Sequence, residues 1–160
     1  MTKMTKGLNQ IAKESNENSH RHGFFTDEEE LFNTLRSDQT FVCVQDKMNV
    51  IKSAKHAYFG QTIAMIHSEL SEAIEADRIN KRANRKDELF TWNERDFTEN
   101  PLTFQTHYQN KMKGTVEDEL IDALIRILGF LDHLNVDTEK HIDLKMRYNA
   151  LREHKHGKSY

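Results

Sequence analysis

The chain has 160 residues, of which 36% are hydrophobic and 31% charged, with six glycines, one proline and a net charge of −3. That length suits one domain with a real core, and the scarcity of glycine and proline favours a mostly helical protein. The lack of a basic excess argues against a nucleic acid polymer as partner. We see no apolar run of about 20 residues that would span a membrane and no signal peptide, so we expect a cytoplasmic protein.

Helical signals begin near the N-terminus. Apolar spacing predicts a first helix that ends before Gly23, a natural helix terminator. Thr26, followed by a run of acidic residues, predicts the start of a second helix. Residues 40–58 could open with a short strand, but three-to-four spacing favours a helix, with a break or kink at Gly60. The single cysteine, Cys43, excludes an internal disulfide and is expected to be a small core residue.

A strong helix is expected over 62–80, with Glu69 at the edge of its buried stripe of Ile63, Ile66, Leu70, Ala73 and Ile74. Residues 81–114 are polar and contain the only proline, which predicts a long connection or insertion with some short structure. We expect the aromatic residues of this segment to pack on the helical core or across a subunit interface, in preference to stacking on a base.

Helix formation is expected to resume after Gly114, with Thr115 as N-cap. Asp118 follows three residues later, a spacing close to that of a capping box. From 120 to 131 the helix is apolar almost all round, which predicts a buried central helix. A last helix is expected from about residue 137 or 138 to 152.

Two pairs of carboxylates stand three positions apart, in Glu69-Leu-Ser-Glu72 and in Glu119-Leu-Ile-Asp122. Residues three apart on a helix point to nearly the same side. Two such helices side by side could therefore bring four carboxylates to one point, where they would repel one another strongly. A hard divalent cation, Mg²⁺ or Mn²⁺, would compensate this charge because it prefers oxygen ligands.

The C-terminal segment carries cations on one helix face. Lys145, Asn149 and Arg152 stand at i, i+4 and i+7, and Lys158 follows in the tail. Next to a metal site such a face suits a phosphate chain. Any one of these residues by itself is more simply explained as part of a solvent-exposed helix face. The prediction of phosphate binding therefore depends on the four residues taken together.

In this order, the residues resemble the MazG-like nucleotide pyrophosphohydrolases of the all-alpha NTP pyrophosphatase superfamily. The family hallmark is an ExxE helix followed by an ExxD helix. The gap from Glu72 to Glu119 is longer than is usual in the family, and Phe25 stands where relatives often have tryptophan. Four parts of the sequence show the resemblance: residues 8–12 together with 22–25, residues 67–73, residues 119–123, and residues 145–152 together with 156–158.

The resemblance implies one all-α domain over 1–160, a helical bundle with 81–114 as a long connection, assembled as a homodimer or homotetramer. It also implies metal-dependent hydrolysis of an NTP or dNTP to a monophosphate and pyrophosphate, as in nucleotide-pool cleaning. Glu69, Glu72, Glu119 and Asp122 would bind Mg²⁺ or Mn²⁺, and Glu69 or Glu72 would orient or deprotonate the attacking water. The phosphates would be held by Lys145, Asn149, Arg152 and Lys158.

Two alternatives stay open. A helical protein with this fold could act by binding a partner without catalysis. A pyrophosphohydrolase of the same type could act on a phosphoribosyl nucleotide instead of a free triphosphate.

Overall fold

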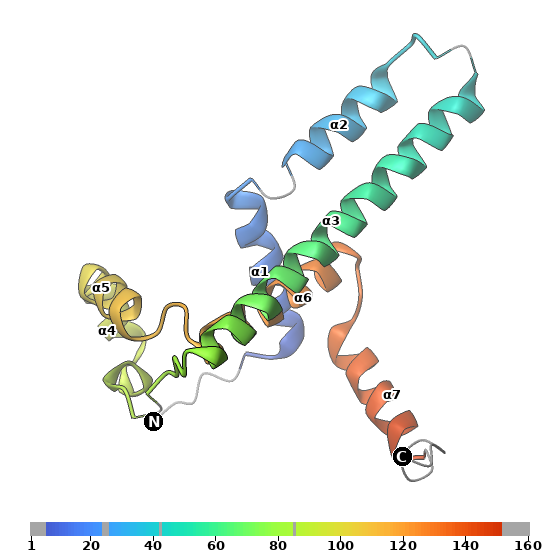
Figure 1. Ribbon diagram of the computed structural model, residues 1–160. Coiled ribbons are helices and arrows are strands. Elements are labelled where there is room, and N and C mark those ends of the chain that lie inside the picture. Colours follow the sequence, from blue (N-terminus) through green and yellow to red (C-terminus); the bar gives the residue numbers. More distant parts are fainter. Residues whose placement is uncertain (1–5, 24–25, 42, 85, 152–160) are drawn as a thin grey trace. The chain divides into compact units, whose positions relative to one another are not determined.

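The computed structural model describes residues 6–23, 26–41, 43–84 and 86–151, and these contain helices and no strand (Figure 1). The protein is therefore all-α, as its composition predicted. None of the helices in the described part is long and apolar enough to cross a membrane. In chain order the elements are α1 (Leu8–Arg21), α2 (Thr26–Ser37), α3 (Val44–Arg78), η1 (Glu88–Thr91), α4 (Glu94–Glu99), α5 (Pro101–Lys111), α6 (Val116–His133) and α7 (Thr138–Ala150).

The contacts divide the chain into two compact units. One comprises 1–54 together with 125–160, and the other comprises 55–124. Helices α3 and α6 each contribute residues to both units. Because each unit is compact by itself, the assignment of 1–160 to one domain stays a prediction.

Most predicted helix ends are confirmed. Helix α1 stops at Arg21, and Gly23 follows with φ of 79°, a conformation that glycine adopts without steric cost. Helices α2 and α3 begin at Thr26 and Val44, so residues from 44 onward form helix, as we favoured. Helix α7 begins after Asp137, whose side chain accepts a hydrogen bond from Lys140 N at 3.1 Å. Phe24 and Phe25 lie outside the described residues.

In the first unit, α1 packs against α7 and against the second half of α6. Asn9 joins α1 to the start of α7, since its side chain donates to Asp137 Oδ1 at 2.9 Å and accepts from Glu139 N at 3.1 Å. Asn16 Nδ2 donates to Asp132 Oδ2 on α6 at 2.9 Å. The α1 backbone comes so close to Gly129 that a Cβ there would lie 3.3 Å from Asn16 N. Gly129 therefore sets how closely these two helices approach.

Helix α3 passes through Gly60 without interruption, so the predicted break is wrong. A glycine within a helix costs only about 1 kcal/mol relative to alanine. The hydrogen bonds of a 35-residue helix on both sides of Gly60 are enough to continue it. A Cβ added at Gly60 would meet no atom within 4 Å.

Replacing Gly60 with alanine should therefore stabilise the protein. The expected gain is about 1 kcal/mol from helix propensity and reduced unfolded-chain entropy, or roughly 2–4 °C in Tm for a chain of this size. Thermal unfolding of Gly60→Ala measures it. Gly114→Ala is the matched control and should lose stability, because Gly114 has φ of 71°. A lower Tm for Gly60→Ala would contradict the open surroundings of this glycine.

The buried face of α3 differs from the predicted stripe. Ile66, Glu69 and Ala73 are buried, with Ala76 one turn on, whereas Leu70 and Ile74 are 38% and 56% exposed. The side chain of Glu69 thus lies on the buried face and not at its edge. The predicted stripe is therefore confirmed at Ile66 and Ala73 and wrong at Leu70 and Ile74, because the buried face is rotated toward Glu69 and Ala76.

Helix α6 is only half buried, which corrects the prediction of a buried central helix. Ala123, Leu128 and Phe130 are buried. Five large apolar residues of the same helix are 38–49% exposed: Leu120, Ile121, Leu124, Ile125 and Ile127. Cys43 is likewise exposed and not part of the core, because it lies in the connection just before α3.

The segment 81–114 holds more regular structure than expected, namely η1, α4 and α5. Its aromatic rings pack on one another. The predicted packing of these rings on the helical core or across a subunit interface stays a prediction. Phe104 lies at the centre, with ring centroids 5.1 Å from Phe97, 5.7 Å from Tyr108 and 6.5 Å from Trp92. The segment therefore has a small aromatic core of its own.

A buried carboxylate ties α5 to η1. Asp87 caps η1 by accepting from Leu89 N at 3.0 Å, and His107 Nε2 lies 2.9 Å from both of its oxygens. His107 Nδ1 lies 3.3 Å from Glu88 Oε1. The hydrogen bond from His107, followed by that from Leu89 N–H, holds the pKa of Asp87 below its usual value.

This lowered pKa gives stability a defined pH dependence. A carboxylate with a lowered native pKa stabilises the fold above its unfolded pKa of about 3.9, and this contribution is lost as the pH falls through the native pKa. Asp87→Asn should therefore unfold at lower temperature than wild type at pH 7, and the difference should shrink in acid. Asp143→Asn, which removes an exposed ion pair with Arg147, is the control and should change Tm little. A Tm difference for Asp87→Asn that does not change with pH would contradict this assignment.

Candidate metal centre

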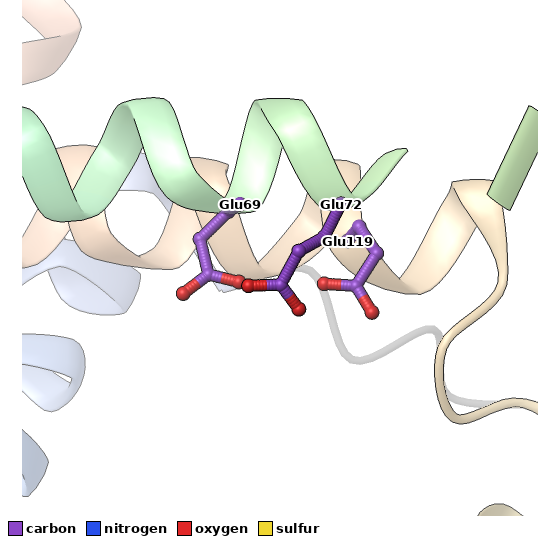
Figure 2. A group of neighbouring side chains, drawn as sticks. All are labelled: Glu69, Glu72 and Glu119. Carbon is purple, nitrogen blue, oxygen red and sulfur yellow. The ribbon is translucent and has the colours of Figure 1, made fainter. Parts of the chain in front are cut away.

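Three of the predicted carboxylates meet at one point. Glu69 and Glu72 project from α3 and Glu119 projects from α6, all within the 55–124 unit. One carboxylate oxygen from each lies within 4.8 Å of the others, and Figure 2 shows the three side chains projecting to the same side with their carboxylates next to one another. The structure thus brings together three of the four acids that the two motifs supplied.

The first turn of α6 is fixed by local hydrogen bonds. Thr115 Oγ1 accepts from Asp118 N at 3.3 Å, and Asp118 Oδ2 accepts from Gly114 N at 2.8 Å, which resembles the predicted capping box. Val116 N donates to Lys81 O at 3.1 Å, so this turn is also tied to the residues that follow α3. These bonds position Glu119, four residues beyond the cap Thr115, beside α3.

Burial and like charge act together on Glu119. The side chains of Glu69 and Glu119 are buried, whereas Glu72 is exposed. Burial raises the pKa of Glu119, and the neighbouring carboxylates, Glu72 first among them, raise it further. A site that opposes the ionisation of its own carboxylates is one that a divalent cation would stabilise. Three carboxylates match the oxygen-ligand preference of Mg²⁺ and Mn²⁺.

Asp122 lies one turn beyond Glu119 on α6 and is exposed. It is not one of the three described acids whose oxygens meet. Its charge nevertheless contributes to the raised pKa of Glu119, which places it near the group. A role for Asp122 as fourth ligand stays a prediction.

The predicted phosphate-binding residues lie in the other unit. Lys145 and Asn149 are exposed on α7, as the i, i+4 spacing implied, and Lys145 Nζ lies 5.2 Å from the ring centroid of Tyr148. Arg152 and Lys158 lie outside the described residues. A site shared by these four residues and the carboxylates stays a prediction.

Two residues near the cluster, Lys81 and Tyr108, were not predicted as site residues. Lys81 Nζ and Glu119 Oε1 lie 2.7 and 3.9 Å from the point that a Cβ on Gly114 would occupy, so a cation stands close to the buried carboxylate. Tyr108 donates a hydrogen bond to Asp118 Oδ1. Lys81 carried no signal beyond its charge, and Tyr108 only that of an aromatic residue in the polar segment, because both reach this place through the path of residues 81–114.

The comparisons with family models, curated proteins and solved structures found no match to this chain. The resemblance to the MazG-like pyrophosphohydrolases therefore rests on the sequence motifs, and of these the structure brings together Glu69, Glu72 and Glu119.

Proposed function

We propose that this protein is a metal-dependent nucleoside triphosphate pyrophosphohydrolase, which cleaves between the α- and β-phosphates and releases a monophosphate and pyrophosphate. The observation that carries the proposal is the convergence of Glu69, Glu72 and Glu119, two of them buried, from two helices. Such a group is costly to bury without a compensating cation. Charged phosphates with a divalent cation form a substrate class that fits an oxygen-rich site.

Each carboxylate has a distinct place in this proposal. Glu69 and Glu119 would hold Mg²⁺ or Mn²⁺ from their buried positions. When bound, the ion would polarise the α-phosphoryl group, lower the pKa of water and neutralise the leaving pyrophosphate. Glu72 is the exposed member, so it is better placed than Glu69 to orient or deprotonate the attacking water.

The charge of the phosphate chain would be met by cations. Lys81 stands close to Glu119 and is a candidate from the same unit. The C-terminal set of Lys145, Asn149, Arg152 and Lys158 is the candidate that the family resemblance supplies. The lysines and the arginine would neutralise phosphate oxygens that the metal does not contact, and the amide of Asn149 would donate a hydrogen bond to them.

The proposal includes a homodimer or homotetramer. In the 55–124 unit, Leu70 and Ile74 form an exposed i, i+4 pair on α3, and Leu120 and Leu124 form another on α6. Exposed large apolar side chains are a feature of subunit interfaces. Light scattering would test this, and a monomer at micromolar concentration would contradict it.

A nucleotide panel tests the function directly. Ribo- and deoxyribonucleoside triphosphates and phosphoribosyl nucleotides would be incubated with Mg²⁺ or Mn²⁺, and pyrophosphate and orthophosphate would be measured separately. Metal-dependent pyrophosphate release supports the proposal and identifies the substrate. Orthophosphate would place the cleavage at a different bond. No release from any nucleotide would favour the non-catalytic binding protein.

A further inference from the structure

An open cavity of about 350 Å³ lies between α5 and the first turns of α6, within the 55–124 unit. This volume is within the range of small-molecule sites. Asp118 and Asp122 form the side that adjoins the carboxylate cluster, since they flank Glu119 in sequence and raise its pKa. The cavity is lined by Phe104, Gln105, Tyr108, Gln109, Lys113, Asp118 and Asp122.

Two aromatic rings form one wall of the cavity and are held in place. Tyr108 donates to Asp118, whose other oxygen is occupied by Gly114 N, and this fixes the ring of Tyr108 against the cap of α6. Phe104 is backed by Phe97, which meets it edge to face at 5.1 Å. Both lining rings are half-buried, so each keeps part of its surface open. Aromatic rings that are fixed in position and partly exposed provide a surface on which a planar heterocycle can stack.

Polar side chains stand beside this wall. Gln105 and Gln109 are exposed on α5 at i, i+4, so their amides lie on the same side of the helix. An amide both donates and accepts hydrogen bonds, and the edge of a nucleobase offers both kinds of partner. Lys113 adds a cation that suits an anionic group of the same ligand.

We propose that this cavity holds the heteroaromatic base of a nucleotide, stacked on Phe104 and Tyr108, with Gln105 and Gln109 hydrogen-bonded to its edge. The inference rests on the proposed function, because the phosphates of the same nucleotide would extend toward Glu119. In this arrangement segment 81–114 would recognise the base, and the carboxylates of the two acidic motifs would act on the phosphates.

Binding of nucleoside monophosphates tests the base site without requiring turnover. AMP, GMP, CMP, UMP and dTMP would be titrated into the full chain by calorimetry, with inorganic pyrophosphate and Mg²⁺ as a ligand that has no base. The fluorescence of Trp92, the only tryptophan, offers a second signal because its ring lies 6.5 Å from Phe104. The variant Gln105→Leu/Gln109→Leu alters exposed residues and should remain folded. Gln61→Leu, an exposed glutamine on α3 outside the cavity, is the matched control.

The double variant should weaken binding of the preferred monophosphate about tenfold, the loss that one to two hydrogen bonds produce. Its binding of pyrophosphate should equal that of wild type, and Gln61→Leu should bind both ligands as wild type does. Equal monophosphate binding by the double variant and wild type would overturn the base site, as would wild-type protein that binds no monophosphate. A third outcome separates the two proposals. If the double variant weakens monophosphate binding but the wild-type protein releases no pyrophosphate from any nucleotide, the base site is supported and the proposed hydrolase function is wrong. Hydrolysis that the variant leaves unchanged would overturn only the base site.

Discussion

Glu119→Gln is expected to lower metal-dependent turnover by roughly 10³-fold or more while leaving the protein folded. The substitution keeps the size of the side chain but removes the charge of the acid that α6 contributes to the cluster. Glu69 and Glu72 would then face a neutral amide, and the site would lose one of the two buried carboxylates proposed to hold the metal. Steady-state pyrophosphate release from the preferred nucleotide measures the effect.

The same variant should be more stable than wild type when no metal is present. Burial and the neighbouring carboxylates raise the pKa of Glu119, so its stabilising protonated form is lost as the pH rises through the native pKa. At pH 7–8 the neutral glutamine avoids that cost, and a gain of about 2–4 °C in Tm corresponds to roughly 1 kcal/mol in a chain of this size. Adding Mg²⁺ should raise the Tm of wild type and not that of the variant.

The control for Glu119→Gln is Glu75→Gln, which removes an exposed carboxylate paired with Arg78 on α3. It should leave turnover and the Mg²⁺ response unchanged, because exposed ion pairs contribute little. Turnover by Glu119→Gln close to that of wild type would refute the metal assignment. A folded variant that is also less stable without metal would show that Glu119 serves the fold instead.

Gly129→Val is expected to cause a large loss of stability, about 2–3 kcal/mol or roughly 5–10 °C in Tm. A Cβ at Gly129 would lie 3.3 Å from the carbonyl carbon and Cβ of Ser15 and from Asn16 N, which is already a close contact. Valine adds two further methyl groups at this place. Because most of the neighbouring atoms are backbone, α1 would have to move away from α6.

Gly60→Val makes the same substitution in an open position and is the matched control. A Cβ there meets nothing within 4 Å, and valine has a higher helix propensity than glycine, so Tm should hold or rise slightly. Thermal unfolding of the two variants side by side measures the difference. Equal changes in Tm would contradict the close approach of α1 to Gly129.

Local chemistry explains what could be predicted from the sequence. Gly23 ends α1, Asp137 caps α7, and Thr115 with Asp118 starts α6, because each of these signals acts through backbone groups only a few residues away. The i, i+3 spacing of Glu69 and Glu72 likewise placed both acids on one side of α3. Such features need no knowledge of distant parts of the chain.

Contacts between residues far apart in sequence decided the rest. Glu119 joins Glu69 and Glu72 while Asp122 stays one turn away, which depends on how α6 lies beside α3. Tyr108 reaches Asp118, and Phe97 on α4 meets Phe104 on α5, only because of the path of that segment.

The sequence by itself therefore determined an all-α chain, most of its helix ends and a set of acids suited to a cation. Only the tertiary structure decided which face of α3 is buried, that α6 keeps Leu120 and Leu124 exposed, and which three acids meet. The physical reason is that helix formation depends on neighbours within about four residues. The burial of a side chain and the pKa of a carboxylate depend instead on atoms that only folding brings near.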